Sequence, residues 1–146
     1  VELSHKHRLC AALTQSGSRH FPVSFILPQQ SLEWQAMLSR CAKKTTHWIL
    51  KPGRGGGGRG VQVLCCRTSE EIKSALLVAE ACAAKSPAVV SSYVERPLLV
   101  HGRKCDLRLY AVVTSFSKSP QEAGTEAAMT AYLFTEGLVR FASEDY

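Results

Sequence analysis

Apolar and polar residues follow two different periods along this chain, which predicts a mixture of helices and strands. Apolar residues can share one side of the segment Ser31–Cys41, which is expected to be helical. Charged and apolar residues mix near the N-terminus, where a helix is expected over Lys6–Leu13. A third helix is expected to begin at Thr68-Ser69-Glu70-Glu71 and to end near Ser86-Pro87. Its first residues form a capping box, because a hydroxyl and a carboxylate stand three residues apart.

Strands are expected where β-favouring residues run together or alternate with a period of two. Besides an extended segment bounded by prolines, Phe21–Pro28, the predicted strands are Trp48–Leu50, Val61–Leu64, Val89–Val94, Cys105–Thr114, Ala131–Phe134 and Leu138–Phe141. We expect the last two to form a hairpin, because Thr135-Glu136-Gly137 between them has turn chemistry. Residues Ser115 to Glu126 are polar and are expected to form an exposed loop. The predicted fold class is therefore α+β, with mostly antiparallel sheets packed against helices.

The segment after Pro52, up to Gly60, consists only of glycine and arginine. It contains a G-x-G-x-x-G spacing, but a strand follows where a dinucleotide-binding fold needs a helix. A P-loop is excluded because no Gly-Lys-Ser/Thr closes the segment. A glycine flap between two strands remains, with backbone N–H groups that can approach a phosphate chain and Lys51 at its entrance. The alternative is an Arg-Gly linker that contacts RNA.

The strand that begins near Cys105 carries charge on one face only. Alternation gives two faces: Lys104, Asp106 and Arg108 on one, and Cys105, Leu107 and Leu109 on the other, which we expect to be core. A charged row inside a β structure needs partners, and ATP with an acidic substrate would supply them. Lys104 would face phosphate, Asp106 the ribose or a cation shell, and Arg108 an acyl phosphate or carboxylate. A solvated face of an antiparallel sheet is the alternative.

Composition narrows the class of protein further. The chain has 146 residues, 45% of them apolar, which suits one domain or a piece of a larger one. A net charge of +6 favours an acidic partner, whether nucleotide, nucleic acid or protein. We expect neither a membrane span nor a signal peptide, and we expect the six cysteines to be reduced thiols of a cytosolic protein. Because nothing closes the domain after Ser143, we expect its C-terminal part to be missing.

Five blocks of residues, taken in order and spacing, resemble the tubulin–tyrosine ligase-like enzymes. The blocks are Trp48-Ile49-Leu50-Lys51-Pro52, Gly58-Arg59-Gly60-Val61, Ser92–Val100, Gly102–Tyr110 and Glu136–Ser143. The resemblance implies an ATP-grasp fold and the joining of an amino acid to tubulin or another protein by way of an acyl phosphate. It divides the chain into an N-terminal segment, 1–20, and a partial ATP-grasp domain, 21–146.

The resemblance also implies a role for each matched residue. In the nucleotide site, Lys51 would bind phosphate, and Gly57 and Gly58 would lie in the flap over the triphosphate. The strand whose backbone meets the adenine edge would be formed by Ser91, Ser92, Tyr93 and Val94. Three further residues would continue the site: Lys104, Cys105 and Asp106. The implied catalytic residues are Arg108, near the reacting phosphate, and Arg140, which would hold the carboxylate of the incoming amino acid.

The chain departs from the family pattern at three of these positions. Gly57 stands where the flap usually carries Gln or Arg, Ser91 replaces a Gln, and Cys105 replaces an aromatic residue. The acidic and Asn ligands that bind Mg²⁺ in such enzymes are expected beyond Tyr146, so we predict no metal ligand in this chain.

These inferences predict an ATP- and Mg²⁺-dependent ligase that adds an amino acid, glutamate above all, to the acidic tails of tubulin or to another acidic protein. A cytoplasmic location, on the cytoskeleton or in the cilium, would follow, with neither membrane nor nucleic acid as a partner. The alternative is a non-catalytic fragment that binds nucleotide or tubulin and lacks the metal site.

Overall fold

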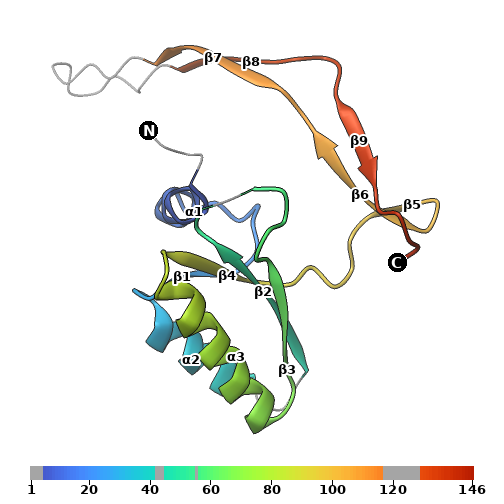
Figure 1. The fold of residues 1–146 in the computed structure, drawn as a ribbon. Helices are drawn as coiled ribbons and strands as arrows, with labels where there is room; N and C mark the ends of the chain where they lie inside the picture. The colour runs from blue at the N-terminus through green and yellow to red at the C-terminus, as the bar shows by residue number, and fades with distance from the viewer. Residues whose placement is uncertain (1–4, 42–44, 55, 117–128) are drawn as a thin grey trace, which may run out of the picture. The chain divides into compact units, whose positions relative to one another are not determined.

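The computed structural model describes residues 5–41, 45–54, 56–116 and 129–146. The chain divides into two compact units, Val1–Glu95 and Arg96–Tyr146. The first unit is an antiparallel sheet with helices on both faces, and the second consists of antiparallel strands (Figure 1). The predicted α+β class with mostly antiparallel sheets is therefore confirmed.

The first unit contains all the helices that the structure describes. Its elements are α1 (Lys6–Gln15), β1 (Ser24–Leu27), α2 (Ser31–Arg40), β2 (Thr46–Pro52), β3 (Gln62–Cys66), α3 (Ser69–Ala83) and β4 (Ala88–Ser92). The strands pair in the order β1-β4-β2-β3, and every pair is antiparallel. The predicted helices and the two strands around the glycine segment are confirmed. The strand predicted to reach Val94 ends at Ser92 instead.

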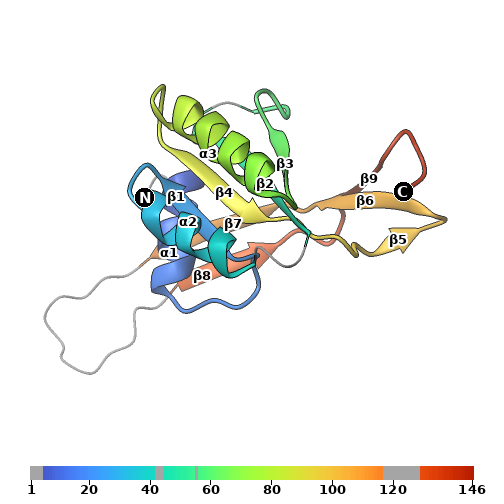
Figure 2. The ribbon, with the colours of Figure 1, turned by 90° about the horizontal axis from the view of Figure 1, so that it is seen from below.

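The hydrophobic core lies between this sheet and the helices α2 and α3. Trp48 and Leu50 of β2 point into it, and Trp34 of α2 meets Trp48 edge-on with ring centroids 6.1 Å apart. Helix α3 contributes alanines at four-residue spacing, Ala75, Ala79 and Ala83, and these small side chains let the helix approach the sheet closely. Figure 1 shows α2 and α3 on one side of the sheet, and Figure 2 views the molecule from that side.

The opposite face of the sheet is only partly covered. Helix α1 packs against β1 and β4 there and buries Cys10. The side chains of β2 that alternate with the core residues, His47, Ile49 and Lys51, point to this face and are half-buried. Tertiary structure therefore places Lys51 on the face of the sheet away from α3.

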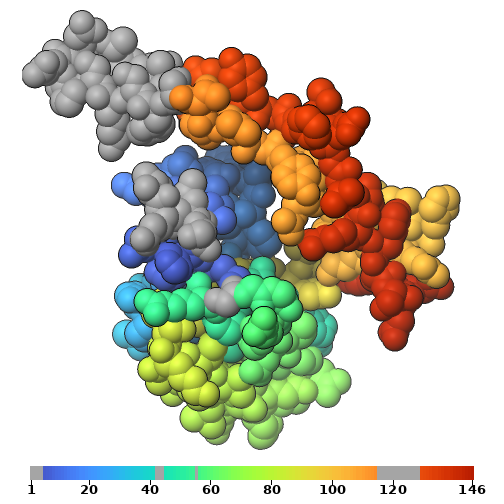
Figure 3. All heavy atoms as spheres, turned by 45° about the horizontal axis from the view of Figure 1, so that its top comes forward, coloured from blue at the N-terminus to red at the C-terminus, as the bar shows by residue number. Residues whose placement is uncertain are grey.

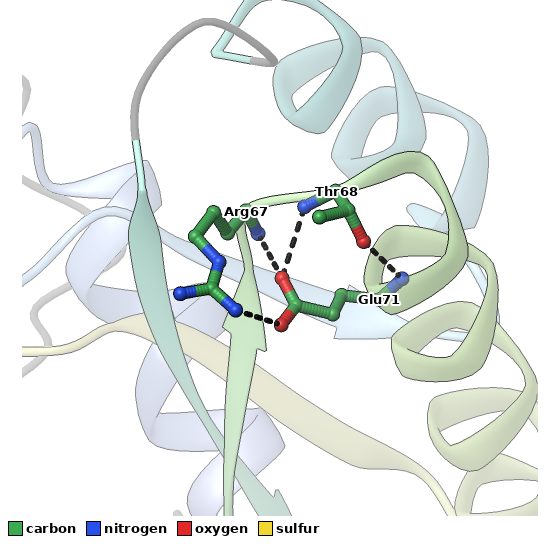
Figure 4. Close-up of polar contacts among 3 residues, drawn as sticks. All are labelled: Arg67, Thr68 and Glu71. Carbon is green, nitrogen blue, oxygen red and sulfur yellow. Dashed lines mark hydrogen bonds and ion pairs between the residues drawn. The ribbon is translucent and has the colours of Figure 1, made fainter.

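Helix α3 begins with the predicted capping box (Figure 4). The backbone N–H of Glu71 donates to the Thr68 hydroxyl at 3.2 Å, and the Glu71 carboxylate accepts from the N–H groups of Thr68 at 2.9 Å and Arg67 at 2.8 Å. These backbone donors, Thr68 first, lower the pKa of Glu71. The local sequence alone therefore fixes where this helix starts.

The second unit is built from β5 (Leu99–Val100), β6 (Arg103–Arg108), β7 (Ala111–Phe116), β8 (Met129–Leu133) and β9 (Leu138–Phe141). Strands β5, β6 and β9 form one antiparallel sheet, and β7 pairs with β8. The hairpin between β5 and β6 turns at His101 and Gly102, which have φ of 52° and 75°. Two successive positive φ values are typical of the type I′ turn, whose twist matches that of paired strands.

Two strand predictions in this unit are wrong. The segment Cys105–Thr114 is two strands, β6 and β7, and the expected hairpin around Thr135-Glu136-Gly137 does not form, because β9 pairs with β6 and β8 with β7. Residues 134–137 instead connect β8 to β9, which run back along β7 and β6. In this connection the Phe134 N–H donates to the Tyr110 carbonyl at 2.8 Å. A Cβ on Gly137 would lie 2.8 Å from the Arg108 carbonyl oxygen, so this close approach favours glycine.

The expected core face of β6 is also a wrong prediction. Leu107 is 65% exposed and Leu109 55% exposed, and none of residues 96–114 and 129–146 is buried. In Figure 3 the orange and red atoms of β6 to β9 form a narrow band. The expected loop begins later than predicted, since Ser115 and Phe116 belong to β7, and its remaining residues lie outside the described ranges. No helix in those ranges is long and apolar enough to cross a bilayer.

Candidate active site

Lys51 is placed by β2, an inner strand that pairs with β4 on one side and β3 on the other. It lies opposite Val89 of β4, one residue before the end of its strand, and is half-buried. The next residue but one, Gly53, is buried, and its N–H donates to the Pro87 carbonyl at 2.7 Å. The base of the glycine segment is thereby fixed to the chain that enters β4.

Gly53 is a glycine for a reason that only the tertiary structure reveals. A Cβ there would lie 2.1 Å from the Pro87 carbonyl oxygen and 2.9 Å from Nδ1 of His7 in α1. A contact of 2.1 Å with a backbone atom forces the chain to move. Any side chain at this position would therefore displace the entrance of the glycine segment from the sheet.

The glycine segment itself turns twice. The Arg59 N–H donates to the Gly56 carbonyl at 3.4 Å around Gly57 and Gly58, whose φ values are 64° and 74°. The Val61 N–H then donates to the Gly58 carbonyl at 3.1 Å, with Gly60 at φ 70°. The signs of φ are those of a type I′ turn followed by a type II turn, and both favour glycine at these positions.

The backbone at the tip of this segment is open to a ligand. A Cβ built on Gly57 or Gly58 would meet no atom within 4 Å, and the side chains of Arg54 and Arg59 are exposed. Backbone N–H groups without a Cβ and two guanidinium groups on one loop suit a phosphate chain. The tip of this loop, as far as the structure describes it, therefore has donors of the kind that bind the polyphosphate of a nucleotide.

Most residues of the predicted adenine strand already form hydrogen bonds within the first unit. Ser91 is buried and its hydroxyl lies 2.8 Å from that of Ser24, while the Ser92 N–H donates to the Val23 carbonyl at 2.8 Å. The Tyr93 N–H donates to the His47 carbonyl at 2.9 Å. The backbone N–H groups of Ser92 and Tyr93 therefore already have acceptors within the first unit. Val94 follows the strand and is exposed.

The second unit brings four predicted residues together. Lys104, Asp106 and Arg108 alternate along β6 as predicted, and Arg140 on β9 lies directly opposite Asp106. Nε of Arg140 donates to Oδ1 of Asp106 at 2.9 Å, and Nη2 donates to Oδ2. These hydrogen bonds lower the pKa of Asp106 and raise the pKa of Arg140. This face therefore carries three cationic side chains and one carboxylate.

An open pocket of about 380 Å³ lies beside the paired strands β6 and β9. Residues from both faces of this strand pair line it: Lys104, Cys105, Asp106, Arg140, Phe141 and Ala142. A shallow pocket with both cationic and apolar walls suits a small ligand that carries a carboxylate or phosphate.

The sequence of the chain as a whole was compared with models of known protein families. The chain matches the model of the tubulin-tyrosine ligase family over residues 3–146. It belongs to that family. The resemblance inferred from the five sequence blocks is therefore confirmed, and so is the ATP-grasp-like fold class.

Individual relatives of the family share about a third of their residues with this chain over the matched region. Tubulin monoglutamylase TTLL4 of Mus musculus is 35% identical over 153 residues, which cover 99% of this chain. Probable tubulin polyglutamylase TTLL2 of Mus musculus is 30% identical over 97% of the chain, and probable alpha-tubulin polyglutamylase Ttll1 of Tetrahymena thermophila is 33% identical over 86%. The chain spans only 11%, 23% and 28% of the length of these three relatives.

The residues assigned by the family resemblance fall into two sets. The first unit holds Lys51, Gly57, Gly58 and the segment Ser91–Val94, and the second holds the charges of β6 and β9. The described ranges contain no group of three or more His, Cys, Asp and Glu residues that could hold a metal ion. The cationic side chains of the two sets suit a phosphate chain and a carboxylate.

Sequence reasoning missed two features of these sets. Gly53 was treated only as one glycine among many, and its close approach to His7 and Pro87 joins distant segments, which no local pattern reveals. The second feature is the close contact between Nδ1 of His47 and Oε1 of Glu95, 2.8 Å apart, which lies beside the predicted adenine strand. His47 and Glu95 are 48 positions apart, so no local sequence pattern predicts their contact.

Proposed function

We propose that this chain provides nucleotide- and amino-acid-binding residues of a ligase that adds glutamate to tubulin or to another acidic protein at the expense of ATP. The observation that carries the proposal is the cationic face of β6 and β9, where Lys104, Arg108 and Arg140 surround one carboxylate. Glutamate is proposed as the added amino acid because the relatives described above are named as tubulin glutamylases.

The proposed reaction has two steps. A carboxylate of the acceptor protein attacks the γ-phosphorus of ATP, so that ADP leaves and an acyl phosphate forms. The amino group of the incoming glutamate then attacks the acyl carbon, phosphate leaves, and a proton from the amine is released as the amide bond forms. Both steps depend on positioning and on neutralising negative charge rather than on a protein nucleophile.

Each residue has a role in this scheme that suits its chemistry. Lys51 and the N–H groups of Gly57 and Gly58 would bind the phosphates, and Lys104, Cys105 and Asp106 would continue the nucleotide site. Arg108 would neutralise the reacting phosphate, and Arg140 would hold the carboxylate of the incoming amino acid. Mg²⁺, when bound, would neutralise phosphate charge; the residues of this chain would orient the phosphates around it.

The charge of the whole chain supports an acidic acceptor. A net charge of +6 attracts a polyanionic peptide such as an acidic tubulin tail over several ångströms, and salt weakens this attraction. A protein that modifies tubulin would work in the cytoplasm, on the cytoskeleton or in the cilium, and we propose those locations for it.

A second candidate is a module that binds nucleotide or tubulin without catalysis. The open glycine loop and the cationic face of β6 and β9 suit binding whether or not a reaction follows. The two candidates differ in a direct assay, because only the ligase incorporates radiolabelled glutamate into tubulin in the presence of ATP and Mg²⁺.

A pair of substitutions tests the residue assignments. Lys51→Ala should weaken the binding of a fluorescent ATP analogue by about tenfold, because one charge-assisted contact with phosphate is lost. Lys73→Ala, which removes an exposed lysine from α3, is the matched control and should leave this affinity unchanged. Arg140→Ala should spare ATP binding and abolish glutamate binding. Equal and negligible effects of Lys51→Ala and Arg140→Ala would contradict the proposal.

A further inference from the structure

The ion pair between Asp106 and Arg140 is more specific than a chance meeting of surface charges. The two residues stand directly opposite each other in the register of β6 and β9. Two parallel hydrogen bonds join them, from Nε to Oδ1 and from Nη2 to Oδ2. Two bonds fix the plane of the guanidinium as well as its position, which a single bond cannot do.

The two hydrogen bonds with Asp106 occupy only one edge of the Arg140 guanidinium, so a second edge can still donate to a ligand. A guanidinium has five N–H donors, one on Nε and two on each Nη. The contacts with Asp106 use the side formed by Nε and Nη2. The end formed by Nη1 and Nη2 still offers a fork of two donors, and that fork matches the two oxygens of a second carboxylate.

We propose that Asp106 is a positioning residue, which holds the guanidinium of Arg140 so that its remaining fork binds the α-carboxylate of the incoming amino acid. This inference rests on the proposed function and adds a role for Asp106 beyond the nucleotide contact. Both side chains are more than half exposed and belong to the lining of the open pocket beside β6 and β9, so a small carboxylate has access to Arg140.

Charge explains why Arg140 needs such a partner. Lys104 and Arg108 lie on the same face of β6, two residues to either side of Asp106. Without a carboxylate between them, three cations would repel one another and Arg140 would turn toward solvent. Asp106 offsets this repulsion and leaves the face cationic, so the face still attracts an anionic ligand.

A second ion pair in the same unit provides a matched control. Arg103, also on β6, donates from Nε to Oδ1 of Asp145 at 3.1 Å, and the Asp145 side chain is 80% exposed. Neither residue belongs to the pocket lining. Asp145→Asn likewise removes a carboxylate from an arginine of the same sheet, so it reports what the loss of any surface carboxylate does.

The experiment measures ligand binding to the purified chain by NMR with ¹⁵N-labelled arginine. The Arg140 Nε–H resonance, assigned by its loss in Arg140→Lys, is followed while glutamate is added with a non-hydrolysable ATP analogue and Mg²⁺. The affinity for the ATP analogue is measured separately by fluorescence. The variants are Asp106→Asn, Asp106→Glu and the control Asp145→Asn.

Asp106→Asn should weaken glutamate binding by about tenfold. Asp106→Glu should restore part of the glutamate affinity, and Asp145→Asn should leave it unchanged. In the Arg140→Lys background, where glutamate affinity is measured by isothermal titration calorimetry, Asp106→Asn should not lower that affinity further, because the two residues act as a unit.

Two results would overturn the inference. One is wild-type affinity for glutamate in Asp106→Asn, and the other is the absence of any glutamate effect on the Arg140 resonance in the wild-type chain. If the wild-type chain binds glutamate through Asp106 and Arg140 but fails to bind the ATP analogue, the inference stands and the proposed ligase function fails. If ATP binds and Asp106→Asn leaves glutamate binding intact, the function stands and the inference fails.

Discussion

The two units of the chain use alternating strands in opposite ways. In the first unit alternation separates a buried side from an open one, so Leu50 is fully buried while its neighbours Ile49 and Lys51 are half-buried. In the second unit apolar residues such as Leu107 and Val139 are more than half exposed. The same period in sequence therefore predicts a strand in both units, but it predicts a core only where helices cover the sheet.

The first unit therefore contains the core that stabilises the chain, and the second contains the charged face that could bind a ligand. The first unit has a core of tryptophan, leucine and alanine side chains, and its sheet holds the glycine segment by its base. The second unit holds its charged face by pairing β6 with β9 and by the contact of Asp106 with Arg140. We therefore expect substitutions in the first unit to affect stability most, and substitutions on the charged face of the second to affect binding most.

The largest expected effect comes from matched leucines in the two units. Leu50→Ala should lower the free energy of unfolding by about 3 kcal/mol, because it removes a fully buried side chain and leaves a cavity. Leu107→Ala, in a residue that is 65% exposed, should change it by less than about 0.5 kcal/mol. Urea unfolding followed by tryptophan fluorescence, which reports the first unit, and by far-UV circular dichroism, which reports both units, measures the two variants. Similar losses from the two variants would contradict the comparison.

A smaller loss is expected from the base of the glycine segment. Gly53→Ala should destabilise the first unit by about 2 kcal/mol, because the new Cβ would lie 2.1 Å from the Pro87 carbonyl oxygen and the chain must shift. Gly56→Ala is the control, since a Cβ there meets no atom within 4 Å. The same urea titration separates them, and equal stability of the two variants would show that Gly53 is not held as described.

The smallest of these effects concerns the first turn of α3. Thr68→Ala should cost about 1 kcal/mol of stability at pH 7, because the capping hydroxyl is lost. The pKa of Glu71 is lowered in the folded state, so its contribution is present above the ordinary value of 4.5 and is lost as the pH falls through the folded value. Urea midpoints measured from neutral pH down to about pH 3 should therefore fall less steeply in Glu71→Gln. An unchanged slope would contradict the cap.

The sequence was sufficient wherever neighbouring residues decide the structure. The capping box at Thr68, the alternation of Lys104, Asp106 and Arg108, and the strands around the glycine segment depend on local spacing, and the structure confirms them. The pairing of β9 with β6 joins residues far apart in the chain, and the turn chemistry of Thr135-Glu136-Gly137 favoured a local hairpin that does not form.

The candidate site shows the same limit. Family blocks identified its residues, and Lys104, Asp106, Arg108 and Arg140 do lie on neighbouring strands of the second unit. The partner of Arg140 could not be predicted, because Asp106 lies 34 positions earlier and had been assigned to the nucleotide. The restriction at Gly53 could not be predicted either, since it depends on His7 and Pro87 in distant segments.

The central claim is that Lys51 and Lys104 each bind nucleotide phosphate, and labelling with a biotinylated acyl phosphate of ATP tests it most directly. Such a probe transfers its label to lysines that lie beside the phosphates of bound nucleotide. We predict labelling of Lys51 and Lys104 that excess ATP prevents, with no ATP-sensitive labelling of Lys73 or Lys85. Labelling that ATP does not reduce, or ATP protection of only one of Lys51 and Lys104, would contradict the claim.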